Sequence, residues 1–201
     1  MNRIVFALIW CTALLVGCQR EVSGLPAPGS SYDISLLSLA AVEKIGGMDH
    51  LTREVDTDEP LVDTYLTEGP CHEVSDQRTA FGDGWIYFRS VADTVDREHG
   101  DPLAPIVSLV QNVIAYPDDD GARAVFERYV VTMGDCAASG SPGLNGKVER
   151  PDQGTAIWVT EGMASVFAIK GTVLVSASAV AVPDAERVAI DMSRAILDRI
   201  A

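Results

Sequence analysis

The sequence is poor in positive charge. It contains 15 Lys and Arg residues against 29 Asp and Glu residues, so its formal net charge is −14 at pH 7. A surface of this sign repels phosphate backbones, which argues against nucleic-acid binding and against a basic patch lying on anionic lipid. Cationic or neutral partners are favoured instead.

The sequence also lacks an apolar run long enough to form a membrane-spanning helix. Residues 4–15 form an apolar run of about 12 residues without charge or proline, whereas a spanning helix needs roughly 20 residues. The run follows a short basic start at Asn2 and Arg3. This pattern is typical of a secretory signal peptide, which we place at residues 1–17.

The signal peptide ends in Leu15-Val16-Gly17-Cys18, which resembles the lipobox of bacterial lipoproteins. The resemblance implies cleavage before Cys18, a diacylglycerol on its thiol and acylation of its freed amine. Each buried CH₂ group contributes about 0.8 kcal/mol, so several acyl chains on one residue make a stable anchor. We therefore expect a protein anchored by lipid to the cell membrane, on the extracytoplasmic face. The alternative is an ordinary signal peptide cut nearby, with Cys18 as a free thiol.

A polar stretch rich in Gly, Pro and Ser follows Cys18. Residues 19–32 read QREVSGLPAPGSSY, and nothing in them can bury a core. Together with Cys18 they are expected to form a flexible tether over residues 18–32. No internal repeat or second linker follows, so residues 33–201 are expected to fold as a single domain large enough to bury a core.

Cysteine is scarce, and its count constrains the redox chemistry. The chain has four cysteines, of which Cys11 lies within the signal peptide. If Cys18 carries lipid, Cys71 and Cys136 remain. An even number of cysteines is then left in an oxidising compartment, so a disulfide between them is expected. Two buried free thiols are the alternative.

The hydrophobic periodicity of the domain predicts an α+β fold. Runs of β-branched and aromatic residues indicate strands, and apolar residues spaced by three or four indicate helices. We expect helices over residues 36–45, 71–79 and 118–133 and from residue 183 onwards, and strands over residues 85–91, 106–116, 155–160, 164–169 and 172–179. Short extended pieces are expected over residues 51–55 and 61–66. Adjacent hairpins favour a twisted, mainly antiparallel sheet with helices packed on one side.

An acidic triplet, Asp118-Asp119-Asp120, marks the start of the third helix. Carboxylates in a first turn suit the positive end of the helix dipole. The triplet precedes glycine, as in a calcium loop, but position twelve of that loop falls on Tyr129 and not on a glutamate. We therefore expect the triplet to cap the helix.

Several short motifs occur in a fixed order along the domain. They are Leu36-Leu37-Ser38, Gly69-Pro70-Cys71, Gly84-Trp85, Val113-Ile114-Ala115-Tyr116-Pro117 and Cys136, followed by the last hairpin and the final helix. Their order and spacing resemble the PknH-like extracellular sensor domain, which is found on mycobacterial receptor kinases and lipoproteins. The resemblance implies a twisted antiparallel sheet with helices and a cleft, and a sensor or ligand-binding role without established chemistry. It also implies a disulfide between Cys71 and Cys136.

One region departs from this family. Its members often carry a second disulfide across the late hairpin, but residues 162–164 and 178–180 read Gly-Met-Ala and Ser-Ala-Val in this sequence. The resemblance therefore gives no support for the rigidity of that hairpin or for the shape of a cleft beside it.

These observations favour an extracytoplasmic, lipid-anchored sensor-like or ligand-binding domain that is not an enzyme. The sequence has no G-x-S-x-G motif, and His50, His72 and His99 do not have metal-ligand spacing. We expect no cofactor and no metal, and a ligand that is an unknown small molecule, an envelope component or a partner protein. The alternatives are a hydrolase whose catalytic residues converge only in the fold, and a structural envelope lipoprotein.

Trp158 and three residues on one earlier expected strand are candidates for ligand contact. Alternation along residues 85–91 places Trp85, Tyr87 and Arg89 on one face. Arg89 makes this the wetter face, so the two aromatic rings can lie beside solvent and a ligand. The alternative is that the rings belong to the core or to an interface.

The lipid anchor leads to a first prediction. Replacing Cys18 by alanine removes the only thiol that the lipobox can acylate, so the protein should be released from membranes. Cell fractionation and labelling with radioactive palmitate measure the two effects. A Cys18→Ala protein that stays in the membrane fraction and is cut normally would contradict lipidation at this residue.

Overall fold

The computed structural model describes residues 34, 36–62, 69–95 and 106–200. The expected signal peptide, Cys18, the tether, His99 and most of the expected extended piece at 61–66 lie outside these residues. None of the described helices is long and apolar enough to cross a membrane.

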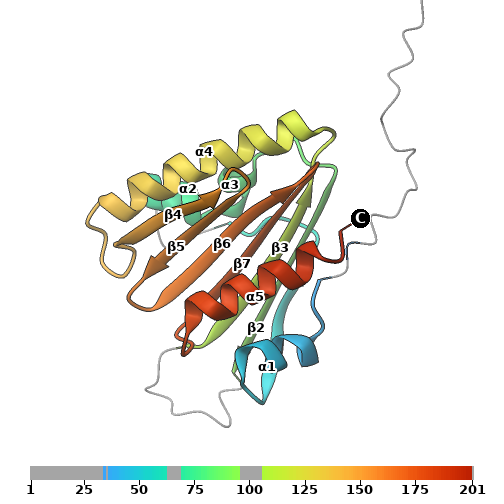
Figure 1. Ribbon diagram of the computed structural model, residues 1–201, viewed down its shortest axis with the longest axis vertical. Coiled ribbons are helices and arrows are strands. Elements are labelled where there is room, and N and C mark those ends of the chain that lie inside the picture. The colour runs from blue at the N-terminus through green and yellow to red at the C-terminus, as the bar shows by residue number, and fades with distance from the viewer. Residues whose placement is uncertain (1–33, 35, 63–68, 96–105, 201) are drawn as a thin grey trace, which may run out of the picture. The chain divides into compact units, whose positions relative to one another are not determined.

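The described residues form one antiparallel sheet of seven strands, which confirms the predicted fold class. Its strand order is β1-β2-β3-β7-β6-β5-β4 (Figure 1). The strands are β1 (Leu51–Thr57), β2 (Tyr87–Val95), β3 (Ser108–Ala115), β4 (Gly146–Asp152), β5 (Thr155–Thr160), β6 (Met163–Lys170) and β7 (Val173–Val180).

The helices cover both faces of the sheet, so the expectation of one covered side is wrong. On one face lie α1 (Leu39–Gly46) and α5 (Ala185–Leu197), and on the other lie α2 (Pro70–Ser75), α3 (Gln77–Phe81) and α4 (Asp119–Ala138). In Figure 1, α5 crosses the near face of the sheet. The reason lies in the central strands, which are apolar at successive positions and not at alternate ones. Such strands are buried on both faces.

Each face has its own hydrophobic core, and β7 contributes to both. Val173 and Val175 of β7 pack against α5, where Val188 and Met192 are fully buried. Leu174, between the two valines, packs on the opposite side with the residues of α4. A side chain of this size contributes about 1.5–3 kcal/mol when it is fully buried.

Helix α4 begins where the acidic triplet predicts. The carboxylate of Asp118 accepts a hydrogen bond from the backbone N–H of Gly121 at 2.7 Å, and Asp119 and Asp120 lie in the first turn. The helix continues to Ala138, so Cys136 lies inside it and not beyond its end. The capping role of the triplet is therefore confirmed, and the predicted end of the helix is too early.

The single helix expected over residues 71–79 is two short helices. Asp76 between them has extended backbone angles (φ −77°, ψ 107°), and its carboxylate accepts a hydrogen bond from Thr79 N at 2.7 Å. Aspartate side chains compete with helix continuation by making this kind of local bond. The same aspartate thus ends α2 and caps α3.

Strand β4 has no counterpart among the predicted elements. Its side chains are almost all exposed, so it lacks the apolar alternation that identifies a strand. It lies at the edge of the sheet and carries charged residues, a common protection of edge strands. It begins at Gly146, where a Cβ atom would lie 2.1 Å from the carbonyl oxygen of Val159.

A disulfide joins Cys71 of α2 to Cys136 of α4, with 4.7 Å between their Cα atoms. This is the pairing that the family resemblance implies. It holds the short helix α2 against the longest helix of the fold, and it spans 65 residues of sequence.

The disulfide leads to a second prediction. Closing a loop of this length lowers the entropy of the unfolded chain by an amount equivalent to about 4 kcal/mol. Treatment with a reductant should therefore lower the free energy of unfolding by about that amount, as measured by urea denaturation. The double variant Cys71→Ser/Cys136→Ser serves as the control, because it should match the reduced protein and not respond to reductant. A wild-type midpoint that is insensitive to reductant would contradict the pairing.

Candidate functional site

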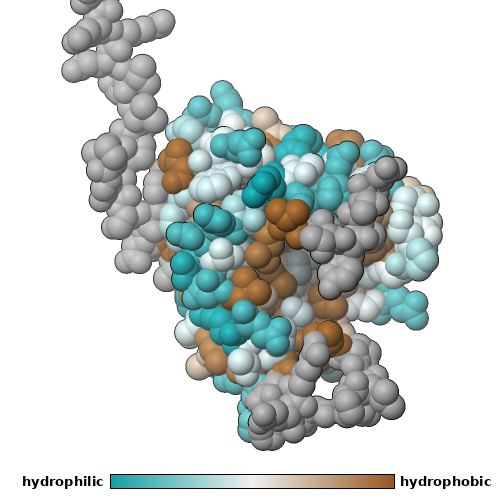
Figure 2. All heavy atoms as spheres, turned by 180° about the vertical axis from the view of Figure 1, so that it is seen from behind, coloured by the Kyte–Doolittle hydropathy of each residue, from teal (hydrophilic) through white to brown (hydrophobic). Residues whose placement is uncertain are grey.

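A cavity of about 220 Å³ lies on the face of the sheet that carries α2, α3 and α4. We call it the polar chamber. It is lined by Val74, Ser75, Gln77, Phe81, Val110, Asn112, Tyr129, Leu144, Trp158, Met163, Ser165, Phe167, Ser176, Ser178 and Val180. On the side of the molecule turned away from α5, apolar side chains gather in the middle of the view with polar ones around them (Figure 2).

A row of polar side chains crosses the sheet, and its members Asn112 and Ser176 form the floor of the chamber. Ser90, Asn112 and Ser176 are direct neighbours on β2, β3 and β7, so their side chains leave the same face. The Asn112 side-chain amide donates to Ser176 Oγ at 3.5 Å. One step along the sheet, the hydroxyl groups of Ser165 and Ser178 lie 2.8 Å apart on β6 and β7.

Gln77 of α3 links this row to the helices. Its amide nitrogen lies 3.2 Å from Asn112 Oδ1 and 3.4 Å from Ser90 Oγ, and donates to both. Its side-chain oxygen accepts a hydrogen bond from Leu61 N at 2.9 Å. Both ends of the Gln77 amide are therefore used for positioning the wall of the chamber.

Trp158 of β5 carries a buried donor without a partner. The residue is 3% exposed, and its indole nitrogen is buried and makes no hydrogen bond with any residue that the structure describes. Its neighbour across the ladder is Ser165 of the chamber floor. A buried donor that is left unpaired costs about 1–3 kcal/mol.

Aromatic rings form the remaining wall. Tyr129 of α4 stacks on Phe81, with ring centroids 6.0 Å apart, and contacts Phe167 at 4.3 Å. Its hydroxyl donates to the carbonyl oxygen of Val74 at 2.9 Å. Burial raises the pKa of Tyr129 above its usual value, so the phenol is neutral at physiological pH.

The described residues that line the chamber include no carboxylate, lysine, arginine, histidine or cysteine. What they offer is a set of hydroxyl and amide groups, one indole donor and aromatic faces. This combination can bind an uncharged polar molecule by hydrogen bonds and ring contact.

The architecture around the chamber can now be compared with known proteins. The family model for the PknH-like extracellular domain matches residues 33–199. The chain belongs to the PknH-like extracellular domain family. The crystal structure of the extracellular domain of PknH from Mycobacterium tuberculosis is similar in fold, with a TM-score of 0.61 and 16% sequence identity, over 82% of this chain and 92% of that one. No curated protein matches the sequence.

The absence of a second cysteine pair in this PknH-like domain does not interrupt the late hairpin. Ala164 and Ala179 occupy directly opposite positions on β6 and β7, and Met163 faces Val180 in the same way. The ladder runs without a bulge over the whole length of both strands. Strand pairing and burial therefore hold this part of the domain together.

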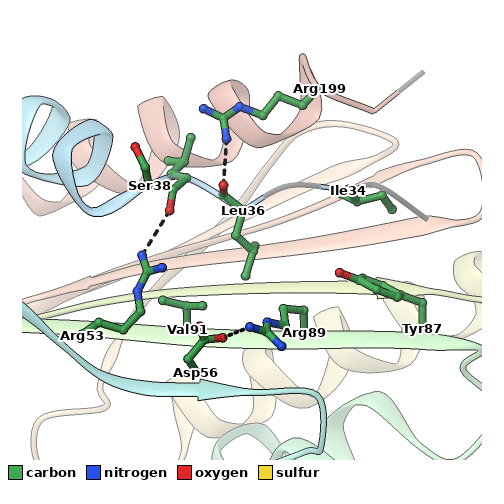
Figure 3. Close-up of a pocket in the computed structure, with 10 residues that line it drawn as sticks. Ile34, Leu36, Ser38, Arg53, Asp56, Tyr87, Arg89, Val91 and Arg199 are labelled. Carbon is green, nitrogen blue, oxygen red and sulfur yellow. Dashed lines mark hydrogen bonds and ion pairs between the residues drawn. The ribbon is translucent and has the colours of Figure 1, made fainter. Parts of the chain in front are cut away.

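The three predicted contact residues do not share one face. Tyr87 packs against the core under α5, whereas Trp85 packs on the opposite side with its ring 5.7 Å from that of Phe88. The predicted alternation fails because β2 begins only at Tyr87, so residues 85 and 86 do not follow the strand period. Tyr87 and Arg89 instead line a different pocket, which lies beside β1, Ile34 and residues 36–38 (Figure 3).

Trp158 is the one residue of the polar chamber that was a candidate from the sequence, and the other lining residues were missed although a signal is present. Strand β7 reads VLVSASAV, in which serine alternates with alanine in an otherwise apolar run. A polar residue repeated at every second position of a buried strand indicates a polar patch on one face. Asn112 gives a comparable signal within β3.

The part of the chain that the structure describes contains no group of three or more His, Cys, Asp or Glu side chains able to hold a metal ion. Cys71 is oxidised, so it does not provide a thiolate beside His72. Asp56 lies within β1 and forms an ion pair with Arg89 of β2.

The unpaired indole leads to a third prediction. Trp158→Phe removes a buried unpaired donor, which recovers about 1–3 kcal/mol and offsets the loss of ring area. The free energy of unfolding should therefore change by less than about 1 kcal/mol, as measured by urea denaturation. Tyr129→Phe is the comparison, because it removes a satisfied donor and should cost about 1–3 kcal/mol. A loss above about 3 kcal/mol for Trp158→Phe would contradict this prediction.

Proposed function

We propose that this chain is a lipid-anchored, extracytoplasmic ligand-binding domain of the sensor type, and that its ligand is a small uncharged polar molecule held in the polar chamber. The observation that carries the proposal is the buried, unpaired N–H of Trp158 beside a row of hydroxyl and amide groups. Membership of the PknH-like extracellular domain family supports the sensor type.

The chamber has a thermodynamic cost that a ligand can offset. Asn112, Ser165 and Ser176 are at most 5% exposed, yet they occupy positions where apolar side chains would pack. The hydroxyl groups of Ser165 and Ser178 form a hydrogen bond with each other. Each hydroxyl group can still form a further hydrogen bond with a ligand. A ligand that accepts from Trp158 and bonds to these hydroxyls replaces unpaired groups by paired ones.

The charge and size of the chamber define the class of ligand. A charged group bound among these residues would have no opposite charge beside it, which is costly in a buried site. The volume of about 220 Å³ is below the roughly 300–1,000 Å³ typical of pockets for drug-sized molecules. The rings of Phe81, Tyr129 and Phe167 favour a ligand with an apolar face as well as hydroxyl groups.

The chemistry of the lining supports binding without catalysis. General acid–base and nucleophilic catalysis need a group that titrates near the working pH or an activated nucleophile. The titratable group among the lining residues is the phenol of Tyr129, which is bonded to Val74 and has a raised pKa.

The lipid anchor in this proposal rests on the sequence. A basic start, a short apolar run, Cys18 in a lipobox-like motif and a polar tether precede the domain. An anchor at Cys18 keeps the chamber outside the cytoplasm and close to the membrane.

The proposal leads to a fourth prediction, which uses the indole N–H as a probe. In a soluble chain that starts at residue 19, Trp85 and Trp158 are the two tryptophans. Titration with glucose and with N-acetylglucosamine should shift the Trp158 indole signal in a ¹H–¹⁵N spectrum and leave that of Trp85 in place, and Trp85→Phe assigns the two signals.

The matched variants for this experiment differ by one hydroxyl group. Ser165→Ala and Ser178→Ala remove hydroxyls from the chamber and should weaken the shift, whereas Thr132→Ala removes an exposed hydroxyl bonded within α4 and should not. No shift of the Trp158 signal with either sugar, or a shift that is unaffected by the serine variants, would contradict the proposal.

A further inference from the structure

A second pocket lies across the sheet from the polar chamber. It has a volume of about 510 Å³ and is bounded by β1, β2, Ile34, residues 36–38 and Arg199. We call it the arginine pocket, because Arg53, Arg89 and Arg199 line it (Figure 3). Tyr87 and Val91 of β2 form its floor with Arg89, on the face opposite to that of Phe88.

The arginine pocket concentrates positive charge in a protein that has little of it. Three guanidinium groups lie here, in a chain with 15 Lys and Arg residues and a net charge of −14. Arg53 pairs with Asp93, Arg89 pairs with Asp56, and Arg199 donates to Leu36 O at 2.8 Å.

Arg53 is held rigidly and still has donor capacity. Its Nε and Nη2 atoms donate to the two oxygens of the fully buried Asp93 at 2.9 and 3.3 Å, and Nη2 also donates to Leu37 O at 3.2 Å. The hydrogen bond to Asp93 raises the pKa of Arg53 above its usual value. No described residue accepts a hydrogen bond from Nη1, which leaves two N–H groups on a preorganised guanidinium.

Arg89 forms an ion pair whose carboxylate partner a ligand can replace. Its partner is Asp56, and both side chains are 39% exposed. Ion pairs between exposed groups contribute little to stability, because water competes for both charges. An anion on a ligand can therefore take the place of the Asp56 carboxylate, and a planar guanidinium binds carboxylate and phosphate oxygens in the same two-pronged geometry.

From this arrangement we infer that the arginine pocket binds a small molecule through a carboxylate or phosphate group. Arg89 exchanges Asp56 for the anion, and Arg53 donates to it from Nη1. The ring of Tyr87 and the side chains of Leu36 and Val91 contact the remainder of the ligand. The large negative charge of the chain does not prevent binding, since interactions beyond about 8 Å are screened at physiological ionic strength.

Substitutions of the two partners of the Arg89–Asp56 ion pair should change the affinity for an anion in opposite directions. With citrate and inorganic phosphate as probes, isothermal titration calorimetry at low salt should show that Arg89→Gln weakens binding at least about tenfold. Asp56→Asn removes the internal competitor and should tighten binding about two- to fivefold. A purely structural ion pair would make both variants bind as the wild type does, or both bind less.

The Arg150–Glu127 ion pair provides a matched control. Its side chains are 39% and 44% exposed, and neither residue lines the pocket. Arg150→Gln and Glu127→Gln should leave anion affinity unchanged, and an equal loss in Arg150→Gln would point to general electrostatic attraction and overturn the inference.

The anion could be carried by a soluble molecule or by a lipid head group, and sedimentation with phosphatidylglycerol vesicles distinguishes the two. Binding to either source that is lost in Arg89→Gln and strengthened in Asp56→Asn supports the inference. Absence of binding to citrate, phosphate and vesicles alike would overturn it. The outcome is separate from that for the polar chamber, because the two pockets share no residue.

Discussion

Burial of the central strands on both faces is the constraint on which the rest of the structure depends. β3, β7 and β6 have helices on each side, so every side chain they carry must either pack or find a hydrogen-bond partner. On the α5 face, Val175, Ala177 and Ala179 of β7 satisfy this by packing. On the other face, Ser176 and Ser178 can satisfy it only through polar neighbours, and these neighbours make the polar chamber.

The elements of the fold were predictable where local chemistry decides them. The Asp118 cap of α4 and the hairpin between β6 and β7 rest on residues close in sequence. The second covered face of the sheet was missed because hairpin order alone does not say how many faces are buried. The consecutive apolar residues 113–115 of β3 and 173–175 of β7 do indicate burial on both faces. β4 was missed because an exposed edge strand has no apolar period.

The candidate sites were less predictable, since each depends on strand register. Ser90, Asn112 and Ser176 are far apart in sequence and form a row only because three strands pair with no shift at these positions. Tyr87 and Arg89 were placed together correctly by alternation, whereas Trp85 was not, because the strand begins two residues after it. Alternation predicts a face only within the strand, and the start of a strand is the feature that sequence patterns locate least well.

The two pockets differ in how they connect to the segment that leads into the domain. Leu37 follows the expected tether closely, and its backbone is held by Gln111, which accepts from Leu37 N at 2.8 Å, and by Arg53, which donates to Leu37 O. Leu37 and Arg53 both line the arginine pocket, so this clamp forms part of its wall. Asn112, next to Gln111 on β3, points to the other face and into the chamber. Between the chamber and Leu37 lies β3, which is paired along both edges and resists displacement. Of the two pockets, the arginine pocket is therefore the one whose lining includes the start of the described domain.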